Sequence, residues 1–226
     1  MNKNNITLVM ALVLAVLLLV PLGNLALYVL FGIDVAAVVV LGGAAVIGKV
    51  KKTKLQSVQF VPGFLLVWSI FNIALAVAFS RNIITTEAFE NQNKISCLFG
   101  KNTSTPNIII SSVIFLCHTI SGLILGKAGN NRLKEQWKAV KNEGNKEKLE
   151  FYGKLEGSFC FLKGAFIFIL LITAVIFFGS TLAGSLMYGK PILECLKENI
   201  LLATGTSLLF QALNILGTFF VACCFV

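Results

Sequence analysis

Six long apolar stretches constrain this chain more than any other feature of its sequence. They cover residues 6–31, 35–48, 58–79, 107–126, 164–187 and 199–226. A helix crosses the hydrocarbon layer with about 20 mainly apolar residues, and helices are expected there because lipid cannot pair with open backbone groups. The composition agrees, since 57% of the 226 residues are hydrophobic and 13% are charged. We therefore predict an all-α, polytopic integral membrane bundle of six transmembrane helices, built as a single membrane domain over residues 1–226.

The position of the first turn is left open by the sequence. Pro21–Asn24 are turn-forming residues, and a turn there gives helices at 6–20 and 25–48. A turn at 32–34 with a kink at Pro21 instead gives spans 6–31 and 35–48, and it places Asp34 near the outer end of the hairpin. Further alternatives are five crossings with a re-entrant second segment, or a cleaved signal peptide at 6–20.

The two apolar lobes of residues 6–48, separated by a short turn, resemble the bilobed hydrophobic pairs of inclusion-membrane proteins that some intracellular bacteria secrete. The resemblance covers this region only and has no residue-specific motif, so it assigns no functional residue. The membrane itself is either a bacterial inner membrane or a eukaryotic plasma or organelle membrane.

The basic residues are divided unequally between the predicted loops. With a cytoplasmic N-terminus, 14 of the 19 Lys and Arg residues fall in inner segments 1–5, 49–54 and 127–163, and five fall outside. The 10 acidic residues divide equally. Because inner loops carry the excess of Lys and Arg, we expect both termini in the cytoplasm, with an outer loop at 80–106. The net charge of +9 therefore reports orientation and does not indicate a nucleic-acid partner.

The longest polar segment is the basic inner loop 127–163. Leu133, Trp137 and Val140 are spaced as one face of a helix, residues 142–145 interrupt it, and a second helix is expected from Lys146 into the fifth span. The simpler interpretation is a solvated hairpin. A compatible one is a basic surface that contacts anionic lipid headgroups, with Trp137 at the interface.

Polar residues recur along one face of the last span. Five of them are three or four positions apart, which is the spacing of one helical stripe: Thr204, Ser207, Gln211, Asn214 and Thr218. Asn72 and His118 are expected at a depth similar to that of Gln211 and Asn214. We therefore predict a polar layer near the bilayer centre that contains Asn72, His118, Gln211 and Asn214. Such residues commonly join membrane helices by hydrogen bonds, and the alternative is a wetted path for a solute.

Small residues and cysteines form two further patterns. Small residues recur at helical spacing and are expected to let backbones approach closely: Gly153, Gly157, Gly164, Gly179, Ala183 and Gly184. Cys97 and Cys195 fall in the two outer loops, where an oxidising compartment would allow a disulfide between them.

Reactive constellations are absent from the sequence. His118 has no second ligand at metal-binding spacing, and no phosphate-binding loop, hydrolase motif or C-x-x-C is present. We expect no catalytic residues, cofactor or metal. The leading hypothesis is a non-enzymatic subunit of a membrane complex, with other membrane subunits or a second copy as partner. The alternatives are a small channel or permease for a neutral solute lined by the last span, and a thiol-dependent membrane enzyme.

Overall fold

Five long helices make up the described part of the protein. The computed structural model describes residues 22–51, 59–85 and 105–225. The helices are α2 (Asn24–Lys51), α3 (Val61–Thr85), α5 (Thr105–Glu143), α6 (Lys146–Tyr188) and α7 (Ile192–Phe225). Each contains a segment that is long and apolar enough to cross a membrane. The predicted all-helical bundle is confirmed to that extent, while residues 6–20 of the predicted first span lie outside the described residues.

The first described helix corrects one of the two predicted turn positions. α2 runs without interruption through residues 32–34, so a turn there is wrong, and its start at Asn24 fits a turn just before it. Asp34 consequently does not lie at the end of a hairpin. It is the eleventh of the 21 residues in the apolar segment Asn24–Ala44. Hydrogen bonds from α3 hold the Asp34 side chain inside the bundle.

The turns between α5 and α6 and between α6 and α7 are explained by the residues at the helix ends. Gly144 adopts a positive φ of 73°, which glycine tolerates without a steric penalty. Asn145 then caps α6 by accepting a hydrogen bond from the Lys148 backbone N–H. At the other end of α6, Gly189 has a φ of 65° and its N–H bonds to the Gly184 carbonyl, a left-handed helix cap. Pro191 follows two residues later, so the chain turns sharply into α7.

The predicted inner loop 127–163 is mostly helical. α5 continues from its apolar part through to Glu143, and α6 begins at Lys146 and continues into its own apolar part. The expected break at 142–145 and the start at Lys146 are present, but the first helix is an extension of α5 and not a separate element. The two extensions pack together as a helical hairpin, which we call the basic hairpin (residues 127–163).

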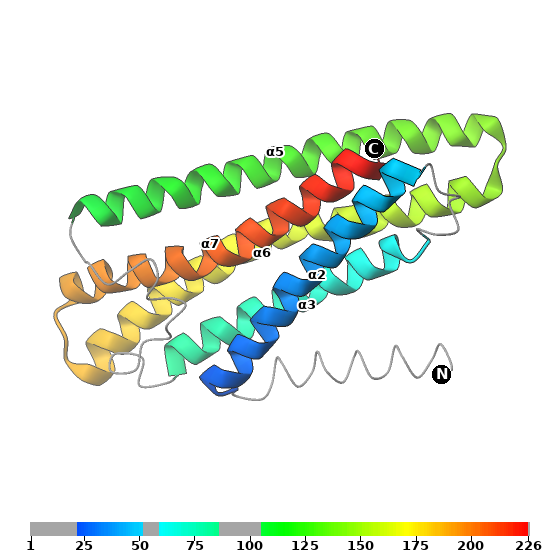
Figure 1. The fold of residues 1–226 in the computed structure, drawn as a ribbon. Helices are drawn as coiled ribbons and strands as arrows, with labels where there is room; N and C mark the ends of the chain where they lie inside the picture. The colour runs from blue at the N-terminus through cyan, green and yellow to red at the C-terminus, as the bar shows by residue number, and fades with distance from the viewer. Residues whose placement is uncertain (1–21, 52–58, 86–104, 226) are drawn as a thin grey trace.

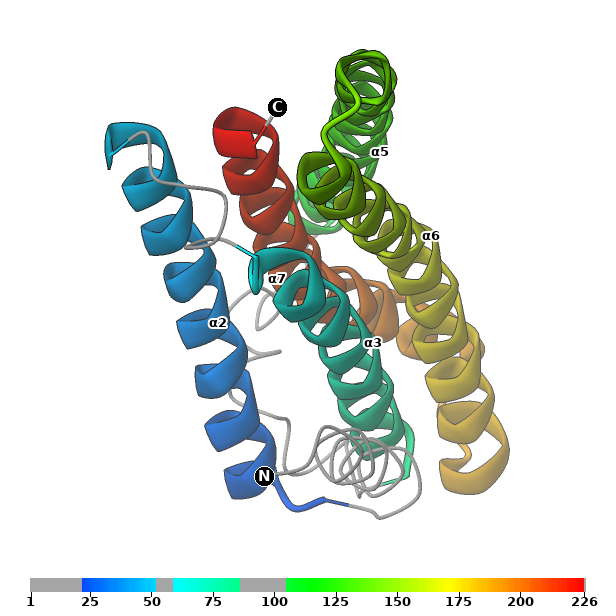
Figure 2. The ribbon, with the colours of Figure 1, turned by 90° about the vertical axis from the view of Figure 1, so that its right-hand side faces the viewer.

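The five helices lie side by side and alternate in direction along the chain (Figure 1). α7 is the central helix, since it contacts each of the other four, while α6 contacts α3, α5 and α7. Seen along the bundle, α2 lies on one side and α5 and α6 lie on the other, with α3 and α7 between them (Figure 2). The residues of α7 are accordingly the most buried, and those of α5 the most exposed.

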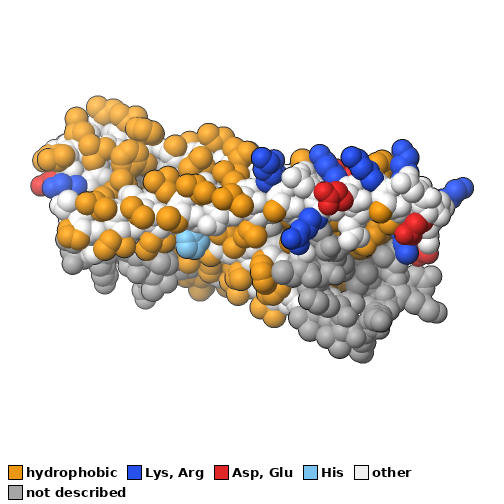
Figure 3. Space-filling model, turned by 90° about the horizontal axis from the view of Figure 1, so that it is seen from above, with side chains coloured by type: hydrophobic (Ala, Val, Ile, Leu, Met, Phe, Trp, Pro, Cys, Tyr) orange, Lys and Arg blue, Asp and Glu red, His pale blue; other side chains and the backbone are white. Residues whose placement is uncertain are grey.

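The interior of the bundle contains an aromatic cluster, and its surface is apolar along one part and charged along another. Phe31, Phe79 and Phe210 form an edge-to-face cluster between α2, α3 and α7, with ring centroids 5.4 to 6.2 Å apart. The outward face of α5 is apolar along its first half and carries Lys and Arg side chains along the basic hairpin (Figure 3). An apolar exposed belt next to a charged end is typical of helices that leave a bilayer.

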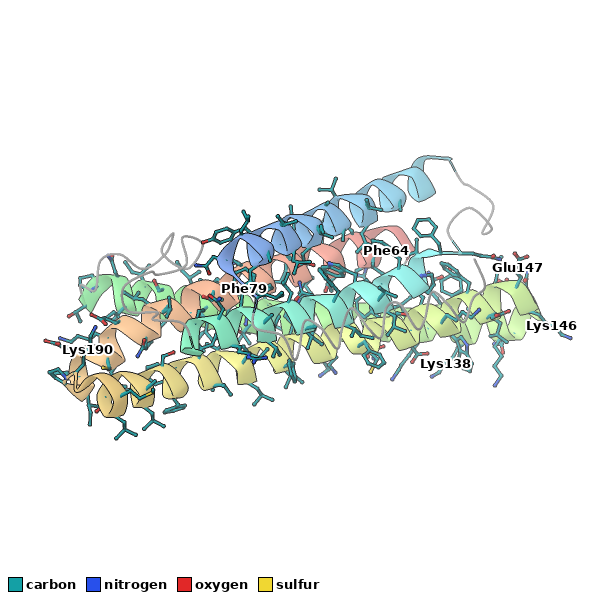
Figure 4. All side chains as sticks on the ribbon, turned by 90° about the horizontal axis from the view of Figure 1, so that it is seen from below. Phe64, Phe79, Lys138, Lys146, Glu147 and Lys190 are labelled. Carbon is teal, nitrogen blue, oxygen red and sulfur yellow. The ribbon has the colours of Figure 1, made fainter. Side chains whose placement is uncertain are left out.

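The two ends of the bundle carry different charged groups. Lys138, Lys146 and Glu147 lie at the basic-hairpin end, whereas Lys190 lies at the opposite end (Figure 4). The cytoplasmic placement of the basic end stays a prediction from the charge distribution.

Candidate functional site: a buried polar layer around Asp34

The polar stripe of α7 lies in the centre of the bundle. Each of its five members is buried, with exposed fractions of 6% or less: Thr204, Ser207, Gln211, Asn214 and Thr218. Because α7 contacts all the other described helices, the stripe meets polar side chains of several neighbours. The stripe thus lies inside a packed interior in the described structure.

Asp34 is the ionisable centre of this layer. Its side chain is fully buried. The Trp68 indole N–H donates to one carboxylate oxygen at 2.7 Å, and the Asn72 amide donates to the other at 2.8 Å. Both distances are typical of hydrogen bonds to a charged acceptor, which contribute about 1.5–3 kcal/mol each. Residues from α2 and α3 are therefore joined around one carboxylate.

The network continues from α3 to α7. The Asn214 amide N–H donates to the Asn72 amide oxygen at 3.2 Å, so the three side chains form a line in which every N–H points toward Asp34. Asn72 and Asn214 are both fully buried. The directed amides place the positive end of each dipole toward the carboxylate, which stabilises a negative charge at Asp34.

Trp68 reaches Asp34 because α7 has no side chain at position 217. A Cβ built on Gly217 would lie 2.5 Å from two ring atoms of Trp68, closer than side-chain atoms pack. Gly217 and Asn214 are three residues apart and lie on the same face of α7. The glycine thus leaves room for the ring, and the asparagine extends the hydrogen bonds that the ring makes.

A second part of the layer joins α7 to α5 and α6. The Gln211 amide donates to the Thr119 hydroxyl at 2.8 Å, and the hydroxyls of Thr173 and Ser207 are hydrogen-bonded to each other. Thr119 and Thr173 also bond to carbonyls of their own helices. α7 is therefore bonded through its stripe to α3, α5 and α6, with Asp34 of α2 reached through Asn72.

His118 lies outside this layer, although it was predicted to belong to it. Its side chain is half-buried, and its Nδ1 lies 3.1 Å from the Ile114 carbonyl of the same helix. The adjacent residue Thr119 points inward and contacts Gln211. The structure thus brings together Asn72 and Asn214, places Gln211 on the same buried stripe, and leaves His118 on the apolar outer face of α5 (Figure 3).

Two buried oxygen atoms in the layer have no hydrogen-bond partner within the described part of the chain. They are Oε1 of Gln211 and Oδ1 of Asn214, both on fully buried side chains. Buried polar atoms are nearly always paired, and each exception requires an explanation such as a water or an ion. Both atoms belong to the same stripe of α7 as the network that ends on Asp34.

The predicted small-residue faces have different environments. Gly153 packs against the Trp137 indole, whereas Gly157 and Gly164 face open space. Gly184 is buried, and Gly179 and Ala183 are half-buried. Close glycine packing also occurs on α5, where a Cβ at Gly122 or Gly129 would overlap a phenylalanine ring of α6. The spacing of Gly122, Gly126 and Gly129 is a small-residue pattern that the sequence analysis missed.

The predicted Cys97–Cys195 disulfide involves Cys97, which lies outside the described residues. Cys195 is fully buried near the start of α7. Among the described residues, no group of three or more His, Cys, Asp or Glu side chains is placed to hold a metal ion.

An apolar groove adjoins the polar layer on the outside of the bundle. It has a volume of about 590 Å³ and lies between α2 and α7. Its lining includes Val35, Val38 and Leu213. Val35 follows Asp34 in the chain, Val38 lies one helical turn after Asp34, and Leu213 precedes Asn214. The groove is apolar throughout, so the polar layer does not open into it in this structure.

Asp34 is the functional candidate that sequence reasoning misplaced. A signal was present, because Asp34 stands between apolar residues on both sides, and ionisable residues inside spans are rare and functional by default. Comparison with protein-family models, with curated proteins and with solved structures finds no match for this chain.

Proposed function

We propose that this chain is a non-enzymatic multi-pass membrane protein that serves as a subunit of a membrane complex through its basic hairpin. The observation that carries the proposal is the length of α5 and α6, which have 39 and 43 residues. A bilayer core needs about 20 residues of helix. Residues 127–143 therefore extend about 25 Å beyond the apolar part of α5 at 1.5 Å per residue.

The two helices of the basic hairpin are packed together and against the start of α3. Leu133 of α5 and Leu155 of α6 are fully buried, Phe159 fills the space beside Gly129, and Lys134 and Glu156 form an ion pair at 3.9 Å. The hairpin is also tied to the start of α3, because the Gln59 amide donates to Glu147 at 3.0 Å. A preorganised element binds with a smaller loss of conformational entropy than a flexible loop.

The exposed surface of the hairpin favours an acidic partner. Lys127, Lys134, Lys138 and Lys141 are spaced by seven, four and three residues, so they share one face of α5. The hairpin extends in line with the spans (Figure 1) and is not laid along the membrane plane. Anionic headgroups would thus contact its base near Lys127, while a partner subunit with an acidic surface would contact its length.

Co-purification tests the proposal. The tagged chain is isolated from its own membrane in a mild detergent, and its associated proteins are compared with those of a Lys138→Glu/Lys141→Glu variant. We expect a defined partner that is lost with the variant and released by high salt, because exposed charge contacts are screened. Lys197→Gln, an exposed lysine at the opposite end, is the matched control. A strictly monomeric protein, or binding to anionic lipid vesicles alone, contradicts the proposal.

A second candidate function, a small permease, is favoured by the mid-span Asp34 and the two unpaired amide oxygens of α7. Transport would require the helices around the stripe to separate, since the stripe is packed in the described state. A cysteine at Gln211 or Asn214, in a background without native cysteines, tests this. Labelling by a water-soluble thiol reagent supports a wetted path, and its absence along the whole stripe argues against one.

A further inference from the structure

The outward face of α5 is the least covered face of the five described spans. In its apolar segment 17% of the residues are buried, against 67% in α7, and α5 packs mainly against α6 and α7. Exposed side chains follow this face at steps of three, four or seven residues, which makes a straight row along a helix. We call them the outer row: Ile109, Val113, Leu116, Ile120, Lys127, Lys134, Lys138 and Lys141.

The first half of the outer row is apolar. Its four members, Ile109, Val113, Leu116 and Ile120, are each more than half exposed. Branched aliphatic side chains in such a row fit between those of a helix that lies alongside. Pairing of membrane helices gains no hydrophobic free energy, however, because lipid chains are equally apolar. The apolar half is therefore suited to a partner helix but does not by itself select one over lipid.

The second half of the outer row carries the selective feature, which is its positive charge. The apolar half passes directly into lysines along the same face (Figure 3). Lys127 and Lys138 take part in none of the ion pairs of the described residues, and Lys134 has one, at 3.9 Å to Glu156. The other ion pairs of the basic hairpin are made by Lys148 and Lys154, outside the row. The row thus calls for negative charge from another molecule.

Lipid headgroups can supply that charge at the start of the basic half only. The apolar part of α5 ends just before Lys127, and the headgroup layer adds about 5–7 Å on each side of the hydrocarbon core. Lys138 and Lys141 lie about 16 and 21 Å beyond Lys127 along the helix. Since the hairpin continues in line with the spans (Figure 1), these two lysines lie past the headgroups. Their counter-charge has to come from a protein.

A second copy of the chain does not fit the outer row. In a symmetric dimer the same patch meets itself, so the lysines of one α5 would face the lysines of the other. Like charges brought together in this way repel, which disfavours that pairing. The charge of the row therefore points to a different, acidic chain.

We propose that the outer row of α5 binds one membrane-spanning helix of a different chain, and that this helix continues on the hairpin side of the membrane as an acidic segment. The inference rests on the subunit role of the basic hairpin and names the partner. The contact runs from Ile109 to Lys141, about 48 Å along the helix. Its apolar half lies against the partner's span, and its lysines lie against aspartates and glutamates of the partner's extension.

The two halves of the contact support each other. Charge pairing outside the membrane brings the partner to α5 and fixes its direction, because an acidic segment on the wrong side of the membrane cannot reach the lysines. Once the extension is bound, the two spans are held together at a high effective concentration. Packing of the aliphatic row then adds to the affinity without a hydrophobic gain.

Substitutions in the apolar half test the proposal in the membrane of origin. Leu116→Trp/Ile120→Trp enlarges two exposed side chains, so it disturbs a bound helix without overpacking the bundle. The matched control is Leu171→Trp/Val175→Trp on α6, at positions that are 58% and 57% exposed. In the co-purification described above, we expect the α5 variant to retain at least tenfold less partner and the α6 variant to retain the normal amount. Mass spectrometry should identify a partner whose apolar span is followed by an acidic segment.

A defined probe tests the same surface without the native partner. It is a synthetic helix of about 20 leucine and alanine residues with an extension of about 15 residues, about 22 Å long, in which glutamates recur every three or four positions. Energy transfer to the labelled full-length chain in phosphatidylcholine nanodiscs measures binding. We expect at least tenfold tighter binding than for a probe with lysines in place of the glutamates. Lys138→Glu/Lys141→Glu should remove this preference.

The outcomes separate this inference from the subunit role. A partner that is lost with the lysine variant but kept with Leu116→Trp/Ile120→Trp overturns the intramembrane contact and leaves the subunit role intact. A partner without a span or without an acidic extension also overturns the inference, as does equal binding of the two synthetic helices. A chain that binds lipid alone, or no partner, overturns both. Circular dichroism and the elution volume of each variant verify that it is folded.

Discussion

The indole N–H of Trp68 donates to the Asp34 carboxylate at 2.7 Å, and this bond joins α3 to α2 in the interior of the bundle. Trp68 is 2% exposed and Asp34 is fully buried. The ring is held by α7, where Gly217 leaves room for it. One aromatic side chain therefore couples the positions of three helices to a single buried charge.

The Trp68–Asp34 bond should be measurable as an interaction free energy. Trp68→Phe removes the N–H and leaves a carboxylate oxygen unpaired, so we expect a loss of about 2–3 kcal/mol in the free energy of unfolding. In an Asp34→Asn background the same substitution should cost clearly less, because the acceptor is no longer charged. Unfolding of all four proteins in detergent gives the double-mutant cycle. Equal costs in both backgrounds would contradict the role assigned to the bond.

Gly217 should tolerate no side chain. Gly217→Ala places a methyl group 2.5 Å from the Trp68 ring, which forces the ring or α7 to move, and overpacking of this kind costs about 1–3 kcal/mol. The matched control is Gly63→Ala on α3, because nothing lies within 4 Å of the added Cβ. Alanine has the higher helix propensity, so the control should be neutral or slightly stabilising. A thermal unfolding midpoint that falls by the same amount in both variants would exclude a specific clash.

Alanine substitutions at Gly122 and Gly129 of α5 should destabilise the protein, as Gly217→Ala should. A Cβ at Gly122 would lie 2.3 Å from Phe166, and one at Gly129 would lie 2.5 Å from Phe159. Each alanine substitution should therefore lower the thermal midpoint by separating α5 from α6. Gly164→Ala, on the open side of α6, should not. Equal thermal midpoints for Gly164→Ala and for the Gly122 and Gly129 variants would show that α5 and α6 do not pack in this way.

Substitutions of the adjacent residues Thr119 and His118 of α5 should change the free energy of unfolding by different amounts. Thr119→Val leaves the Gln211 N–H without its acceptor, so we expect a loss of about 1 kcal/mol, the size of an interhelical hydrogen bond in membrane proteins. His118→Leu should be nearly neutral, because the imidazole is only half-buried and its Nδ1 faces a carbonyl of its own helix. Chemical unfolding of both variants makes the comparison. A larger loss for His118→Leu would place His118 in the polar layer after all.

Helical periodicity made part of the buried polar layer around Asp34 predictable from the sequence. Spacings of three and four along one helix are local geometry, so the five residues of the α7 stripe had to share a face whatever surrounded them. Long apolar stretches likewise predicted helices, and Asn145 and Gly144 predicted the break before α6. The continuation of α6 from Lys146 into its apolar part was also predicted. The length of the apolar stretches could not show that α5 continues past its own without a break, because a charged helix and a charged loop have similar compositions.

Sequence by itself determined that this chain forms long apolar helices with a polar face on the last one and a basic segment at one end. The tertiary structure decided which face each helix presents to its neighbours. Thr119 and His118 are equally polar, yet packing against Gln211 turns one inward and leaves the other outside. Asp34 is a turn former by local preference, yet it lies within a continuous helix, and Trp68 and Asn72 bond to its side chain in the interior. Rotation about a helix axis and the pairing of a buried charge depend on partners far away in the chain, and local patterns carry no information about them.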